Sequence, residues 1–98
     1  MRTIKTQNGY GIVNVDSIVS VYVHDAQGQH YMKCETVKDY EYLGEYSIEK
    51  RALDVLDKLN TWLTAHLDYH SDMIVNDDTE KLMREYMHFT MPQNDGDR

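Results

Sequence analysis

Apolar residues in the first half of the chain alternate with polar ones, and this period of two predicts β-strands. Turn-forming residues interrupt the alternation, and the Asn8-Gly9 pair is the strongest of these hairpin signals. The expected strands cover residues 2–6, 10–14, 17–24, 30–37 and 40–46. Because the links between them are short, we expect an antiparallel meander of four to five strands.

Two of these segments differ in how their faces are expected to be covered. In SIVSVYVH both sets of alternating positions contain apolar residues, which is typical of a central strand buried on much of both faces. In YEYLGEY one set contains Tyr40, Tyr42 and Tyr46, whereas glutamates occur in the other set. Strict alternation therefore predicts that these three tyrosines share one face and that one side of this strand is exposed.

After the last strand the apolar period changes to three or four residues, which predicts an amphipathic helix from Ile48 to His66. Ser47 directly precedes this helix and is expected to be its N-cap, because a serine hydroxyl can accept a hydrogen bond from a free amide of the first turn. Apolar residues such as Ala52 and Leu59 recur along one stripe of the helix. We expect this stripe to pack on the sheet and form the core.

The periodic pattern lapses after residue 67 and returns in TEKLMREYMHF, where it predicts a second, shorter helix capped by Asp77 or Asp78. The apolar face of this helix consists of Leu82, Met83, Tyr86 and Met87. We therefore expect one α+β domain, with the sheet and first helix in residues 1–67, followed by a linker and the C-terminal helix in residues 68–91. The polar residues 92–98 are expected to be a disordered tail.

The composition agrees with one small globular domain. The chain has 98 residues, of which 41% are hydrophobic and 28% charged, so it can bury a single core. Cys34 is the only cysteine, which excludes an internal disulfide and a thiolate zinc site and favours a reducing compartment. The N-terminus has no apolar leader segment and no run of about 18 apolar residues occurs, so we expect a cytoplasmic protein that does not span a membrane.

Acidic residues outnumber basic ones by 17 to 10, which gives a net charge of −7. Most of the excess lies after residue 67. A chain of this charge repels phosphate groups, and the sequence contains no basic stripe that would overcome the repulsion. We therefore expect no nucleic-acid binding.

His66 and His70 are candidate metal ligands, because a spacing of four residues places both imidazoles on one face of a helix, near Asp68 and Asp72. The HExxH pattern is absent, however, and histidines near a helix C-terminus are stabilised by the helix dipole without any ligand. We therefore expect no cofactor, no stoichiometric metal and no catalytic activity. The alternative is a small ligand-binding or metal-binding protein, or an enzyme, that uses His66, His70 and nearby carboxylates.

Eight tyrosines are the least ordinary feature of the composition. Tyr22 and Tyr31 can join the tyrosines of residues 40–46 across the sheet. These rings either pack between strands beneath the helix or contact another protein, since tyrosine is common in protein interfaces. We expect a protein-interaction module, for which a homodimer is the simplest assembly. The expected contact residues are Tyr40, Tyr42, Tyr46, Leu82, Met83, Tyr86 and Met87.

A resemblance to known sequences covers residues 2–67. It rests on Gly9, on DSI at 16–18, and on LGEYS at 43–47 followed by Glu49 and Ala52. Through these residues the chain resembles small uncharacterised proteins of Gram-positive bacteria and their phages. The resemblance implies a short antiparallel sheet followed by a helix, and a phage-related origin. The residues that carry it are sheet, turn and helix-start positions, and no activity is implied.

Overall fold

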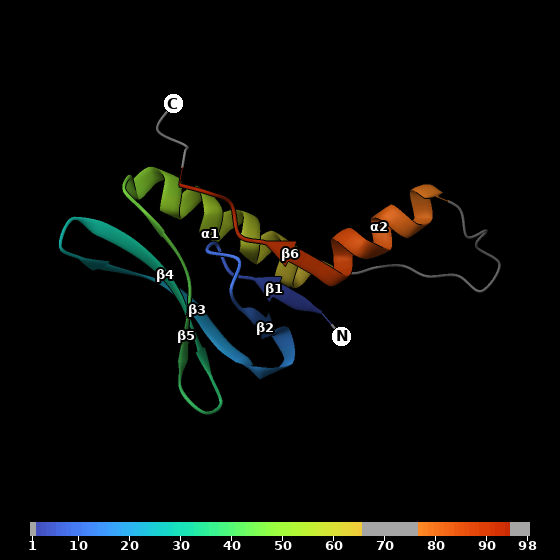
Figure 1. The fold of residues 1–98 in the computed structure, drawn as a ribbon, viewed down its shortest axis with the longest axis horizontal. Coiled ribbons are helices and arrows are strands. Elements are labelled where there is room, and N and C mark those ends of the chain that lie inside the picture. The colour runs from blue at the N-terminus through green and yellow to red at the C-terminus, as the bar shows by residue number, and fades with distance from the viewer. Residues whose placement is uncertain (1, 66–76, 95–98) are drawn as a thin grey trace.

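A computed structural model describes residues 2–65 and 77–94 of the chain (Figure 1). Its elements are β1 (Thr3–Lys5), β2 (Ile12–Asn14), the 3-10 turn η1 (Val15–Ser17), β3 (Ile18–Ala26), β4 (Gln29–Thr36), β5 (Tyr40–Tyr46), α1 (Glu49–Thr64), α2 (Asp77–Met87) and β6 (His88–Thr90). The α+β class expected from the sequence is confirmed. Within this described part of the chain, neither helix is both long and apolar enough to cross a membrane.

The strands of the described residues form two three-stranded sheets, β2-β1-β6 and β3-β4-β5, so the expectation of one meander is wrong. The turn η1 redirects the chain between β2 and β3 and thereby separates the sheets. Asn14 stabilises this turn, because its side-chain oxygen accepts a hydrogen bond from the Asp16 amide and its carbonyl accepts one from the Ser17 hydroxyl. A meander is kept only in β3, β4 and β5, which pair antiparallel in chain order.

Two turns link neighbouring antiparallel strands, and each contains a glycine with a positive φ. Gly9 has a φ of 79°, and the Asn8 side chain accepts a hydrogen bond from the Tyr10 amide at 2.9 Å, so this pair lies in the turn between β1 and β2. Lys5 pairs with Ile12, however, so residues 6–11 link the strands and the connection is longer than the two-residue loop that Asn-Gly predicts. Gln27 and Gly28 have φ values of 53° and 77°, which match a type I′ turn between β3 and β4. This tight turn fixes which residues of β3 and β4 face each other.

Strand β3 lies at the edge of its sheet, because β4 pairs with both β3 and β5. The prediction of a central strand at residues 17–24 is therefore wrong. Val19 is apolar yet 63% exposed, and the register shifts between Ile18 and Ser20. A bulged edge strand can carry an apolar residue without a covering layer, so apolar residues at both sets of positions do not identify a central strand.

Helix α1 begins at Glu49 and ends at Thr64, close to the expected limits. The predicted serine cap is wrong, because the N-cap residue is Ile48 and it makes no capping hydrogen bond through its side chain. The Ser47 amide instead donates to the Asn94 side-chain oxygen at 3.1 Å. Asn94, which is far from Ser47 in the sequence, thus binds the residue that local sequence rules select as the helix cap.

The core lies between α1 and the two sheets. Ala52, Val55 and Leu59 are fully buried and recur every three or four residues, as expected for an amphipathic helix. They pack with buried residues of both sheets and of the segment after β6, namely Ile4, Val13, Met32, Cys34, Leu43, Tyr46 and Met91. Burial raises the pKa of the Cys34 thiol, so this cysteine stays protonated at neutral pH and serves as a core residue.

The C-terminal segment completes the smaller sheet, because β6 pairs in parallel with β1 and the following Met91 is buried. The Pro92 carbonyl then accepts hydrogen bonds from the Tyr46 hydroxyl at 2.7 Å and from Gln7 Nε2 at 3.2 Å. The structure thus differs from the expected tail at residues 92–94. The reason is that backbone carbonyls can bind buried donors without any apolar partner. Residues 95–98 lie outside the described residues.

The stability of the protein is expected to fall between about pH 10 and 12 because of Tyr46. This side chain is fully buried, and its burial raises the pKa of Tyr46 to about 12, whereas an exposed tyrosine titrates near 10. The folded state therefore holds the phenol proton more tightly than the unfolded state. The resulting stabilisation is complete below about pH 10 and is lost as the pH rises through 12, by about 2 to 3 kcal/mol.

Urea unfolding of wild type and Tyr46→Phe over this pH range measures the effect. At neutral pH the variant should be about 1 kcal/mol less stable, because it lacks the hydrogen bond to Pro92. Above about pH 10 the wild type should lose more stability than the variant, so the difference should shrink and then reverse. Parallel loss of stability in both proteins would show that Tyr46 is not the responsible group.

Candidate protein-interaction surface

A β-bulge in β5 changes which side chains share a face. Lys33 of β4 pairs with Tyr42 of β5, whereas the preceding Met32 pairs with Gly44, so Leu43 is an extra residue in β5. One extra residue turns all later side chains of a strand to the opposite face. The alternation predicted for residues 40–46 is therefore interrupted at Leu43.

The bulge separates Tyr46 from Tyr40 and Tyr42, so the prediction that the three tyrosines share one face is wrong. Tyr46 points into the core, where it is fully buried and its hydroxyl donates to the Pro92 carbonyl. It therefore cannot contact a partner in the folded protein. Tyr40 and Tyr42 lie on the other face, the outer face of the β3-β4-β5 sheet.

The outer face of this sheet brings four tyrosines around one lysine. Lys33 lies in the central strand, directly between Tyr22 of β3 and Tyr42 of β5. Tyr31 and Tyr40 precede Lys33 and Tyr42 by two residues on their strands, so they point to the same face. We call these five residues the tyrosine face. α1 packs on the opposite side of the sheet, where the alternate residues of β4 are buried in the core.

Aromatic and cation–π contacts organise the tyrosine face. The rings of Tyr31 and Tyr42 lie 6.3 Å apart between centroids and are tilted by 57°. Lys33 Nζ lies 5.1 Å from the centre of the Tyr40 ring and 6.0 Å from that of Tyr31. Tyr40 is 57% exposed and Tyr22 is 37% exposed. The face is therefore held in place by its own contacts and still offers aromatic surface to solvent.

Carboxylates flank the tyrosine face. Glu35 pairs with Tyr40 across β4 and β5, and Glu45 pairs with Tyr31. Partial burial, together with the negative charge of Glu45, raises the pKa of the Tyr42 phenol. The hydroxyl of Tyr42 is protonated at neutral pH, as in any tyrosine near its ordinary pKa, and can donate a hydrogen bond. The surface thus has an aromatic centre with one positive charge and a negatively charged margin.

Lys33 is the member of the tyrosine face that sequence reasoning did not select. The sequence does indicate that Lys33 lies beside Tyr31, because the two residues are two positions apart in one strand and must share a face. Tyr22 also lies on this face, as the alternation in its strand allowed. The one sequence signal for the bulge at Leu43 is the adjacent Gly44, because a glycine inside a strand often marks a bulge, whereas the apolar pattern fits a regular strand.

The structure does not bring the C-terminal helix to the tyrosine face. Figure 1 shows that α2 extends beyond one end of α1, away from the hairpin of β3 and β4. On α2, Leu82 is 49% exposed and Met83 is 38% exposed. Tyr86 and Met87 are partly buried, and the Arg2 guanidinium lies 4.1 Å from the centre of the Tyr86 ring. The two groups of expected contact residues therefore belong to separate surfaces.

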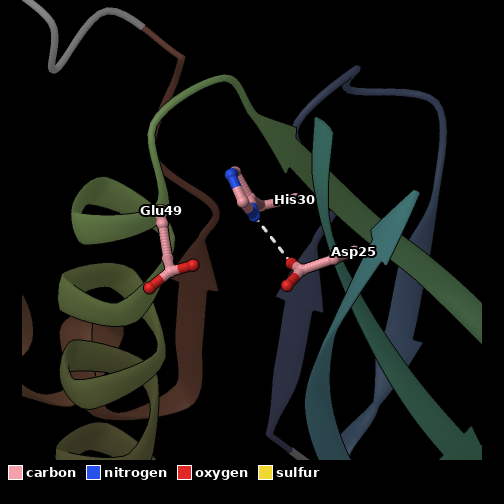
Figure 2. A group of neighbouring side chains, drawn as sticks. All are labelled: Asp25, His30 and Glu49. Atoms are coloured by element: carbon pink, nitrogen blue, oxygen red, sulfur yellow. Dashed lines mark hydrogen bonds and ion pairs between the residues drawn. The ribbon is translucent and has the colours of Figure 1, made fainter. Parts of the chain in front are cut away.

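A second candidate site consists of Asp25, His30 and Glu49 (Figure 2). One potential ligand atom from each side chain lies within 4.8 Å of the others. His30 Nδ1 and Asp25 Oδ1 are 2.6 Å apart and form a hydrogen bond. The metal ligands suggested by the sequence, His66 and His70, lie outside the described residues.

Comparison of the chain with protein-family models, with curated proteins and with solved structures found no match. The function is therefore inferred from the geometry and chemistry of the candidate sites. The tyrosine face spans all three strands of one sheet, whereas the second site involves three side chains at the end of a hairpin. The tyrosine face thus provides the broader surface for a macromolecular contact.

Proposed function

We propose that the protein is a cytoplasmic protein-interaction module that forms a homodimer by packing two tyrosine faces against each other. The observation that carries the proposal is the placement of four tyrosines around Lys33 on the sheet face opposite α1. Tyrosine is enriched in protein interfaces because it combines a large apolar ring with a hydroxyl that can stay hydrogen-bonded. Its few rotatable bonds also keep the entropy loss on binding small.

The charges of this surface are self-complementary. Lys33 is central, whereas Glu35 and Glu45 lie toward the margins. In a two-fold symmetric contact the same patch is used by both protomers, so the lysine of each can approach a glutamate of the other. The same glutamates disfavour nucleic acid, because they oppose the approach of phosphate groups to the aromatic rings.

Sedimentation velocity over a range from low to several hundred micromolar protein tests this proposal. The wild type should shift from monomer to dimer as the concentration rises. Lys33→Glu should weaken the dimer at least about tenfold, because it replaces the central positive charge by a negative one between two acidic margins. Tyr40→Ala should also weaken it, and this variant does not threaten the fold because Tyr40 is largely exposed.

Lys58→Glu is the matched control, because it makes the same charge change on an exposed position of α1, away from the tyrosine face. Its dimer should be as stable as that of the wild type. A wild type that stays monomeric at all concentrations would refute the proposal, as would equal effects of Lys33→Glu and Lys58→Glu. Dimer loss only in Val19→Lys would assign the interface to the edge of β3 instead.

A further inference from the structure

We infer that Asp25, His30 and Glu49 form a binding site for one divalent transition-metal ion, for which Zn²⁺ is the appropriate probe. This inference is independent of the proposed dimer. The tight turn of β3 and β4 places Asp25 directly opposite His30 in the register of the hairpin. Both residues alternate with the outward-pointing positions of their strands, so their side chains lie on the α1 side of the sheet.

The third residue comes from the start of α1. Strand β5 ends at Tyr46, which pairs with His30, and the chain then turns over the end of the hairpin into the helix. Glu49 is the first residue of α1. Figure 2 shows its carboxylate extending from the helix toward the space beside His30 and Asp25. Three separate elements thus direct potential ligands to one place.

The spacing of these groups suits a metal ion. Their ligand atoms lie within 4.8 Å of one another, and the ligands of a tetrahedral zinc ion are about 3.4 Å apart. His30 Nδ1 and Asp25 Oδ1 lie only 2.6 Å apart, so the Asp25 side chain, which is 64% exposed, would rotate to separate these two atoms, and the exposed Glu49 side chain would move toward them. The His30 side chain is only 17% exposed and provides a more fixed nitrogen ligand.

The donor set indicates the kind of ion. One imidazole nitrogen and two carboxylates without a thiolate are ligand types that Zn²⁺ accepts, and three protein ligands leave a fourth position for water. Zn²⁺ binds nitrogen and oxygen ligands more tightly than Mn²⁺ or Fe²⁺, which makes it the more sensitive probe. A bound ion would connect the hairpin of β3 and β4 to the beginning of α1, two parts that move apart on unfolding.

Isothermal titration of the full chain with Zn²⁺, after removal of metal by a chelator and dialysis, tests the inference. We expect one ion per chain and a rise in melting temperature with the Zn²⁺ concentration, since the ion binds only the folded site. His30→Ala and Glu49→Gln should each weaken binding at least about tenfold. Glu49→Gln keeps the size of an exposed side chain, so its effect is not due to unfolding.

The variant His66→Ala/His70→Ala separates this site from the pair of histidines that the sequence suggests. It should bind Zn²⁺ as tightly as the wild type if Asp25, His30 and Glu49 form the site. No binding by the wild type at submillimolar Zn²⁺ would overturn the inference. Binding that is unchanged in Glu49→Gln, or that is lost only in the variant without His66 and His70, would overturn it as well.

Discussion

Replacing Arg2 by alanine is expected to lower the free energy of unfolding by about 3 to 4 kcal/mol. The Arg2 guanidinium lies between the rings of Trp62 and Tyr86, 4.1 Å from each ring centre. It donates hydrogen bonds to the carbonyls of Trp62 and Leu63 at the end of α1, and to the Tyr86 carbonyl in α2. One side chain thus joins both helices and binds carbonyls in the last turn of each helix, where the helix dipole favours a positive charge.

Arg2→Lys should recover only part of this loss, because an ammonium group cannot stack between two rings and donate in three directions at fixed angles. Lys5→Ala is the control, since Lys5 lies exposed at the end of β1, three residues after Arg2. Denaturant unfolding followed by Trp62 fluorescence measures the change. Hydrogen exchange at residues 85–90 should also increase in Arg2→Ala. A loss below about 1 kcal/mol would contradict the role assigned to Arg2.

Replacing Gln7 by alanine is expected to cost about 3 kcal/mol of stability. The Gln7 side chain binds β5 as a neighbouring strand would, because its Oε1 accepts from the Glu45 amide at 2.9 Å and its Nε2 donates to the Glu45 carbonyl at 3.0 Å. The same Nε2 donates to the Pro92 carbonyl at 3.2 Å. Alanine removes all three bonds and leaves partly buried backbone groups without these partners.

Gln93→Ala is the matched control for this prediction, because it removes a single, exposed hydrogen bond from an amide side chain to the Gln7 carbonyl. It should cost less than about 1 kcal/mol. Gly44 provides an independent check, since a Cβ atom there would lie 3.0 Å from Gln7 Cβ. Gly44→Ala should therefore also destabilise the protein in urea unfolding. If Gln7→Ala and Gln93→Ala had equal effects, the side chain of Gln7 would not connect the sheets.

The features that sequence reasoning predicts correctly depend on residues close together in the chain. The Asn8-Gly9 pair correctly locates the turn between β1 and β2, because the preference for a turn follows from two or three residues, although the connection spans residues 6–11. The buried stripe of α1, which includes Val55 and Leu59, follows from the helical period alone. Both rules act locally, so no knowledge of the rest of the fold is required.

The features that sequence reasoning misses depend on residues far apart in the chain. Ser47 does not cap α1, because the N-cap residue is Ile48 and the Ser47 amide and hydroxyl both donate to the Asn94 side chain. Nothing in the sequence near residue 47 indicates this. The segment after α2 becomes a strand because β1 offers it a free edge. The bulge at Leu43 depends on how β5 fits against β4, since an isolated strand would alternate regularly.

The candidate sites also combine features that nearby residues determine with features that depend on residues far apart in the chain. The membership of Tyr31 and Lys33 in the tyrosine face follows from alternation within one strand, and the pairing of Asp25 with His30 follows from a two-residue turn. Glu49 lies near Asp25 and His30 only because β5 ends beside His30, so that α1 begins close to the turn of the β3-β4 hairpin. No spacing rule connects Glu49 to the other two residues, whereas the spacing of four between His66 and His70 is a local pattern.

Intermolecular nuclear Overhauser effects in a dimer mixed from labelled and unlabelled protein test the central proposal most directly. If two tyrosine faces pack together, ring protons of Tyr40 and Tyr22 in one protomer should show contacts with residues of the same face in the other. These contacts should disappear in Lys33→Glu under the same conditions. Contacts that arise only from Leu82 and Met83 of α2, or the absence of any intermolecular contact at high concentration, would contradict the proposal.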